Sequence, residues 1–136
     1  MVNFHGWFCL SSTFVYPDNL KYTTDNLIQE KLDEQAWNEG STNLFAHIKR
    51  MNGGTYLYIG GDRNHFGIKD EIFELLEFIR EVDNGAYGIL YVHDDESRIS
   101  AIATGYGVYI MKRGKIHYAP DPWLSPLIPT VEDEMD

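Results

Sequence analysis

The chain contains a single cysteine, Cys9, among 136 residues, so no disulfide can form within it. No stretch approaches the ~18 consecutive apolar residues that a membrane-spanning helix needs. The apolar run over residues 4–16 has no Lys or Arg before it, and Asn, His and Ser interrupt the N-terminal region, which argues against a signal peptide. We therefore expect a protein of the reducing cytoplasm.

Basic residues are scarce: 11 Lys and Arg stand against 21 Asp and Glu, which gives a formal charge of −10 and a pI near 4.8. This balance disfavours nucleic acid and anionic membranes as partners, because affinity for phosphate comes largely from Lys and Arg. It favours a basic protein partner, whose association long-range attraction would accelerate. Solubility alone is the competing explanation of the charge.

Aromatic residues are plentiful, and the length is that of one ordinary domain. We predict a single domain over residues 1–136 with an irregular, acidic tail from about residue 119. That tail holds four of the five prolines and no basic residue. Proline keeps it extended, so that Trp123, Leu124 and Ile128 are expected to press on the domain while Glu132 and Asp133 stay exposed.

The order of elements predicts an α+β fold, with a mostly antiparallel sheet of about six strands and two helices packed on it. Asn52-Gly53 indicates a tight hairpin turn, and Gly60-Gly61 indicates a loop. Helices are expected near residues 25–39 and 68–82, the second having the clearest apolar periodicity. Strands are expected near residues 3–15, 43–51, 55–59, 86–93, 101–112 and 115–118.

A charge cluster follows the most apolar of these strands. Four consecutive apolar residues, 89–92, suit a strand buried on both faces. Asp94, Asp95 and Glu96 come directly after His93, and they cannot be buried unpaired. The cluster can bind a metal ion or meet a positively charged partner.

Recognised metal and catalytic patterns are absent. The cluster and His65 match no calcium loop or H-E-x-x-H motif, and adjacent strand residues point to opposite faces. Cys9 lies between Phe8 and Leu10, where a small buried hydrophobe is expected. We predict no enzyme activity, no cofactor and no metal. The alternative is a metal-dependent hydrolase or a small-ligand binding domain using Asp94, Asp95 and Glu96.

Several short motifs occur in an order that resembles the immunity protein 7 family of bacterial polymorphic-toxin systems. They are Phe4-His5-Gly6-Trp7, Asn52-Gly53, Asn64-His65, Tyr87-Gly88-x-Leu90-Tyr91-x-x-Asp94-Asp95-Glu96, Arg113-Gly114 and Leu124-Ser125-Pro126-x-x-Pro129-x-x-Glu132-Asp133. Leu127 stands where the family pattern often has a cysteine, which argues against a thiol role there.

The resemblance implies a non-enzymatic protein that binds and neutralises a toxin domain made by the same or a sibling cell. Many such toxins are nucleases, which are basic because they hold nucleic acid. An acidic inhibitor can imitate the phosphates of the toxin's substrate. Our candidate toxin contacts are Asp94, Asp95 and Glu96, followed by Glu132 and Asp133; a purely structural turn at Asp94 is the alternative.

Overall fold

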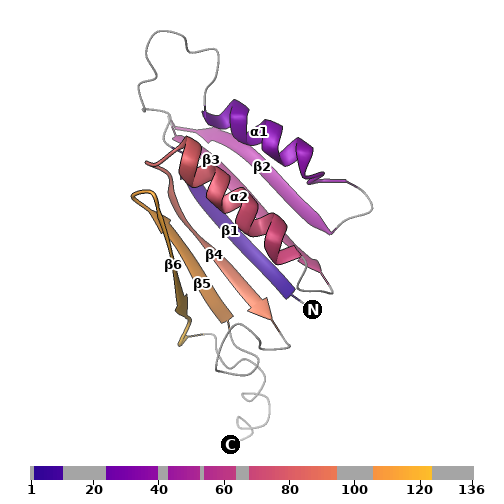
Figure 1. The fold of residues 1–136 in the computed structure, drawn as a ribbon, viewed down its shortest axis with the longest axis vertical. Coiled ribbons are helices and arrows are strands. Elements are labelled where there is room, and N and C mark those ends of the chain that lie inside the picture. The colour runs from indigo at the N-terminus through magenta and orange to yellow at the C-terminus, as the bar shows by residue number, and fades with distance from the viewer. Residues whose placement is uncertain are drawn as a thin grey trace, which may run out of the picture.

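The computed structural model describes residues 2–10, 24–39, 43–52, 54–63, 68–94 and 106–123, apart from the side chains of residues 63, 68–70 and 94. Six antiparallel strands form one sheet in the order β2-β3-β1-β4-β5-β6. The strands are β1 (Val2–Leu10), β2 (Leu44–Met51), β3 (Gly54–Arg63), β4 (Tyr87–Asp94), β5 (Tyr106–Lys112) and β6 (Lys115–Pro120). The helices are α1 (Thr24–Glu34) and α2 (Ile68–Val82) (Figure 1). The predicted fold class is confirmed.

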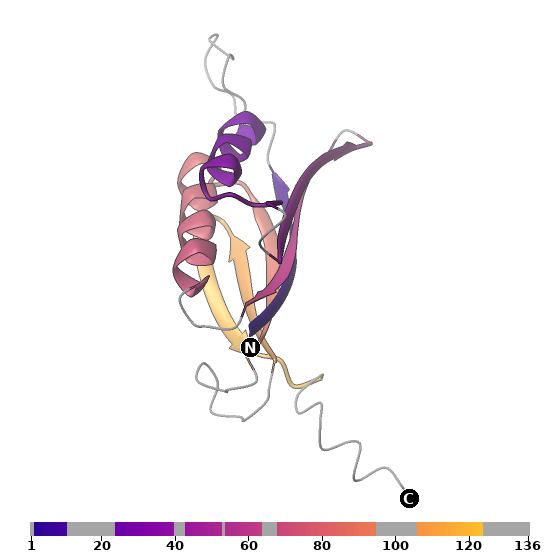
Figure 2. The same ribbon diagram turned by 90° about the vertical axis from the view of Figure 1, so that its right-hand side faces the viewer.

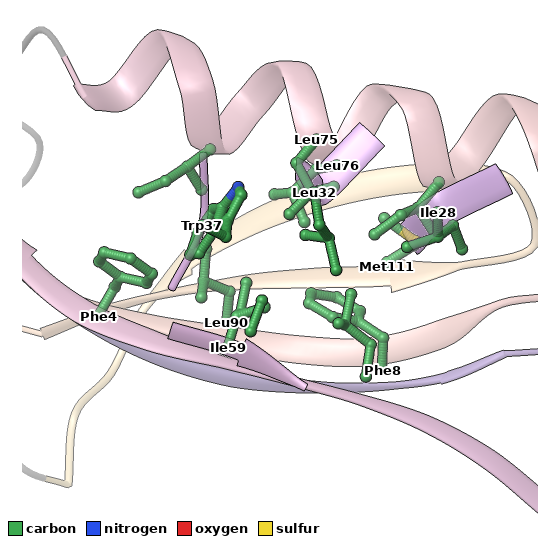
Figure 3. Close-up of a cluster of buried hydrophobic side chains, with 14 of the residues drawn as sticks. Phe4, Phe8, Ile28, Leu32, Trp37, Ile59, Leu75, Leu76, Leu90 and Met111 are labelled. Atoms are coloured by element: carbon green, nitrogen blue, oxygen red, sulfur yellow. The ribbon is translucent and has the colours of Figure 1, made fainter. Parts of the chain in front are cut away.

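Both helices lie on one face of the sheet (Figure 2), because each presents one apolar stripe. In α2 the stripe is Ile72, Leu75, Leu76 and Ile79, all at most 4% exposed. Alternate strand residues meet it, among them Phe4, Phe8, Ile59 and Leu90 (Figure 3). We call this side of the sheet the covered face.

Helix α1 ends at Glu34, so the prediction of a helix to residue 39 was wrong. The amide of Trp37 donates to the Leu32 carbonyl (3.1 Å) and that of Ala36 to the Asp33 carbonyl (3.1 Å). This is a Schellman motif, with Ala36 at φ 60° where glycine is usual. It folds Trp37 back into the core, where its ring meets the edge of Phe4 (centroids 5.9 Å apart).

Gly60 and Gly61 belong to β3, so the prediction of a loop there was also wrong. They pair with His5 and Phe4 of β1. A Cβ on Gly61 would lie 2.1 Å from the Asn43 carbonyl oxygen. These glycines therefore permit close strand packing, and the Asn64-His65 pair that follows lies outside the described residues.

Residues 89–92 form a strand, as predicted, but they are not buried on both faces. Leu90 and Val92 face the helices at 0% and 7% exposed, whereas Ile89 and Tyr91 are half-buried on the opposite face. Only one face is covered by a helix, so burial alternates along the strand.

The last residues of several predicted elements differ from the prediction or lie outside the described residues. Strand β6 continues through Pro120. Trp123 is 88% exposed, so the prediction that it presses on the domain was wrong; its amide donates to Asp121 Oδ1 (3.0 Å) instead. Residues 11–15, 101–105, Leu124 and Ile128 lie outside the described part of the chain.

Candidate functional site

The face of the sheet turned away from the helices is lined with aromatic side chains. No described helix or strand lies over it (Figure 2). We call it the open face; it consists of the strand residues that alternate with the core. The large hydrophobic residues exposed on it are Trp7, Phe45, Met51, Tyr58 and Tyr87, each 37–50% exposed.

Two rows of paired residues cross the open face from one edge of the sheet to the other. Strand pairing places one row in the order His47–Tyr58–Trp7–Ile89–Ile110–His117. The neighbouring row runs Phe45–Gly60–His5–Tyr91–Val108–Ala119. Neither contains a Lys, Arg, Asp or Glu, and we call them the central rows.

Aromatic contacts order the side chains on this face. Trp7 meets Tyr87 edge to face with centroids 6.2 Å apart, and Tyr91 meets Tyr106 in the same manner at 6.2 Å. The His93 ring stacks on Tyr106 at 4.7 Å. Such geometries add to the stability of packed aromatic pairs. Each of these contacts restricts the rotamers that the paired side chains can adopt.

Cys9 lies half-buried on the open face, not in the core as predicted. Its thiol neighbours the Tyr87 hydroxyl, and the hydrogen bond with Cys9, followed by the charge interaction with that thiol, raises the pKa of Tyr87 above its usual value. At neutral pH the Tyr87 hydroxyl is therefore protonated and able to donate.

Charged residues of the open face lie outside the central rows. Lys49 belongs to the β2–β3 hairpin, and Lys112 and Lys115 to the β5–β6 hairpin; both hairpins lie at the same end of the sheet (Figure 1). Asp62 lies toward the opposite end, where β3 and β4 finish, and it accepts a hydrogen bond from Asn43 Nδ2 (3.1 Å). We call these the hairpin end and the acidic end.

Of the predicted contact residues, only Asp94 lies within the described residues. It is the last residue of β4, at the acidic end, and pairs with Val2 of β1. Asp95, Glu96, Glu132 and Asp133 lie outside the described residues, so their role stays a prediction. Among the residues that the structure describes, no group of three or more His, Cys, Asp or Glu could hold a metal ion.

Negative charge is concentrated on the helices. Helix α1 contains four acidic residues and one basic residue, and α2 contains five and two, so together they have a formal charge of −6. The six strands contain five basic and two acidic residues. The acidic layer and the aromatic open face are thus on opposite sides of the molecule (Figure 2).

The sequence did not lead us to predict the open face as a surface, although several of its residues belong to the motifs of the family resemblance. The motifs of the family resemblance divide by strand alternation: Phe4, Gly6, Gly88 and Leu90 face the helices. His5, Trp7, Tyr87 and Tyr91 face away from them. Alternate residues of a strand point to opposite faces, so applying this rule to the motifs at residues 4–7 and 87–91 could have separated core residues from surface residues.

The fold defines an α+β domain with one sheet face packed and the other open. The chain belongs to the immunity protein 7 family, whose model matches residues 1–133. It is therefore an immunity protein, which acts by binding a cognate toxin. A search of curated proteins finds no match.

One similar solved structure is a phage SAM lyase in complex with S-methyl-5′-thioadenosine. It is 11% identical, over 89% of this chain and 92% of that chain, with a TM-score of 0.35. A TM-score this low carries no argument about this chain. No helix in the described ranges has the length and apolar character needed to cross a membrane.

Proposed function

We propose that this protein neutralises a basic toxin domain in the cytoplasm of the cell that produces the toxin, by forming a 1:1 complex and without catalysis. Membership of the immunity protein 7 family carries the proposal. The formal charge of −10, much of it on the helices, supports a basic partner. A nuclease is the toxin class that this charge fits best, because nucleases are basic where they hold phosphates.

The carboxylates attract such a partner at long range. Electrostatic steering raises the association rate by orders of magnitude and weakens as salt screens it, with a Debye length of about 8 Å at physiological ionic strength. Asp94, Asp95 and Glu96 are the proposed first contacts, and Glu132 and Asp133 the second. Asp94 is the last residue of β4, and Asp95 and Glu96 follow it directly in the chain.

The C-terminal domain of the large secreted protein encoded beside this gene is the test partner. We expect a 1:1 complex by light scattering, and an association rate in stopped-flow that falls as salt rises. Replacing Asp95 and Glu96 by Ala should weaken binding more than tenfold, or ~1.4 kcal/mol. The matched control replaces Glu30 and Glu81, two exposed acids of the helices, by Ala, which removes the same amount of charge from another part of the molecule.

The outcomes separate three possibilities. If both double variants weaken binding equally, Asp95 and Glu96 contribute only through the net charge of the protein. A folded Asp95/Glu96 variant that binds and protects cells as well as the parent would show that the cluster is structural. Absence of any binding by the wild-type protein to that toxin domain would refute the inhibitor proposal itself.

A further inference from the structure

We propose that the central rows of the open face form the centre of the toxin contact, an inference that rests on the proposed function. The toxin would present an apolar patch to these rows, basic groups toward the acidic end and acidic groups toward the hairpin end.

The distribution of residue types supports this assignment. The centres of protein interfaces are enriched in Trp, Tyr, Phe and Met and depleted of charge, whereas their rims are polar. The open face has this pattern: Trp7 and Tyr58 are adjacent in the middle, and the nearest charged side chains belong to the hairpins or the strand ends. Central Trp and Tyr are also the residues that contribute most to binding when they are buried by a partner.

The size of the face also fits a specific interface. Six strands spaced about 4.8 Å apart, each roughly eight residues long at about 3.4 Å per residue, span roughly 700 Å². A standard interface buries about 800 Å² on each partner. One toxin domain seated on this face would thus cover most of it.

The distribution of charge along the open face determines the orientation of the partner. Toward the hairpin end, the open face has Lys49, Lys112 and Lys115, whereas Arg50 belongs to the covered face and pairs with Asp25. Toward the opposite end, the open face has Asp62. A partner with one acidic and one basic flank therefore fits in a single orientation, and the reverse orientation places like charges together.

A second copy of this chain is the competing occupant. Two copies each of charge −10 repel one another, which opposes self-association. A basic toxin is attracted at long range by the same net charge, much of which lies on the helices. We therefore assign the face to the toxin.

Binding by aromatic variants tests the assignment. Trp7→Ala should weaken binding of the neighbouring gene's toxin domain at least tenfold, and Trp7→Ala with Tyr58→Ala at least a hundredfold, both mainly through faster dissociation. Trp7→Phe should retain most of the affinity. Trp123→Ala is the matched control, because Trp123 is 88% exposed and lies beyond the sheet; less than a twofold change is expected.

Footprinting of the wild-type pair gives an answer even if a variant fails to fold. Hydroxyl-radical labelling with mass spectrometry should show Trp7 and Tyr58 protected by the toxin and Trp123 still labelled. Lys112→Glu with Lys115→Glu should weaken binding at least fivefold if the partner's acidic flank lies at the hairpin end.

Tight wild-type binding with normal affinity of the Trp7 and Tyr58 variants and unprotected rings would overturn this inference while leaving the proposed function intact. A toxin-free dimer in sedimentation that Trp7→Ala dissociates would also overturn it, in favour of a second copy.

Discussion

The two faces of the sheet are built from alternate residues of the same six strands, yet they differ in chemistry and in burial. The covered face holds Phe4, Phe8, Leu57 and Leu90, each at most 1% exposed beneath the helices. The open face holds Trp7, Tyr58 and Tyr87, which are 37–50% exposed. Aliphatic side chains and Phe dominate the first, while Trp, Tyr and His dominate the second.

The difference teaches how one strand can serve two purposes. Side chains on the covered face need only fill volume, so apolar groups without polar atoms suit them. Side chains on the open face are in contact with water and, in the proposed complex, offer apolar area to the toxin. Trp, Tyr and His combine a flat apolar ring with a polar atom, and so they satisfy both conditions.

The largest expected effect compares two neighbours in β4. Leu90→Ala, on the covered face, should reduce the free energy of unfolding by about 3 kcal/mol, because a cavity remains in a packed core. Ile89→Ala, on the open face, should cost about 1 kcal/mol, because water already reaches that side chain. Urea unfolding with an unchanged m-value measures both.

Equal losses would break the comparison, since they would show that the open face is covered in solution. The toxin should reverse the order of importance: a substitution at Ile89 should affect toxin affinity more than one at Leu90, provided that both variants are folded.

The elements were predictable where local chemistry decides them. The apolar periodicity of α2 gave its bounds, Ile68–Val82, and Asn-Gly and Arg-Gly gave the two hairpins. The alternation in β4 was not predicted, because Ile89 and Tyr91 are as hydrophobic as core residues. Which face a helix covers depends on contacts far apart in the chain.

The candidate surface was harder to predict than the fold for a related reason. Carboxylates such as Asp94 are conspicuous in a sequence, whereas a surface made from single residues of six strands is not. Trp7, Tyr58 and Ile89 become neighbours only through strand register. Ala36 likewise looked helical, because a positive φ at alanine has no signal in the sequence.

A second prediction concerns the turn that ends α1, on the covered side of the sheet. Ala36→Gly should stabilise the protein by about 1 kcal/mol, because glycine adopts a positive φ without the steric cost that a Cβ imposes. Asn38→Gly is the contrast: Asn38 also has a positive φ, but its side chain donates to the Ala46 carbonyl (2.8 Å) and accepts from the Ala46 amide (2.9 Å). That variant should lose about 1 kcal/mol or more.

Chemical unfolding of both variants, with toxin affinity measured alongside, checks this contrast. Stabilisation by both substitutions would mean that the Asn38 hydrogen bonds contribute nothing in solution. A change in toxin affinity with Ala36→Gly would link the covered side to the open face and contradict their independence.

The smallest expected effect concerns the ion pair that joins the two helices. Lys31 Nζ lies 2.6 Å from Glu74 Oε1, and the hydrogen bond with Lys31, followed by its charge, lowers the pKa of Glu74 below its usual 4.5. A carboxyl with a lowered pKa contributes stability above its unfolded pKa and loses it as pH falls through the folded pKa.

Glu74→Gln should therefore lower the Tm slightly at pH 7, and the difference from the parent should vanish near pH 3. Glu81→Gln, which removes an exposed acid seven residues along the same helix, is the matched control for the loss of one charge. A Tm difference that persists at pH 3 would mean that Glu74 acts through packing between the helices and not through its charge.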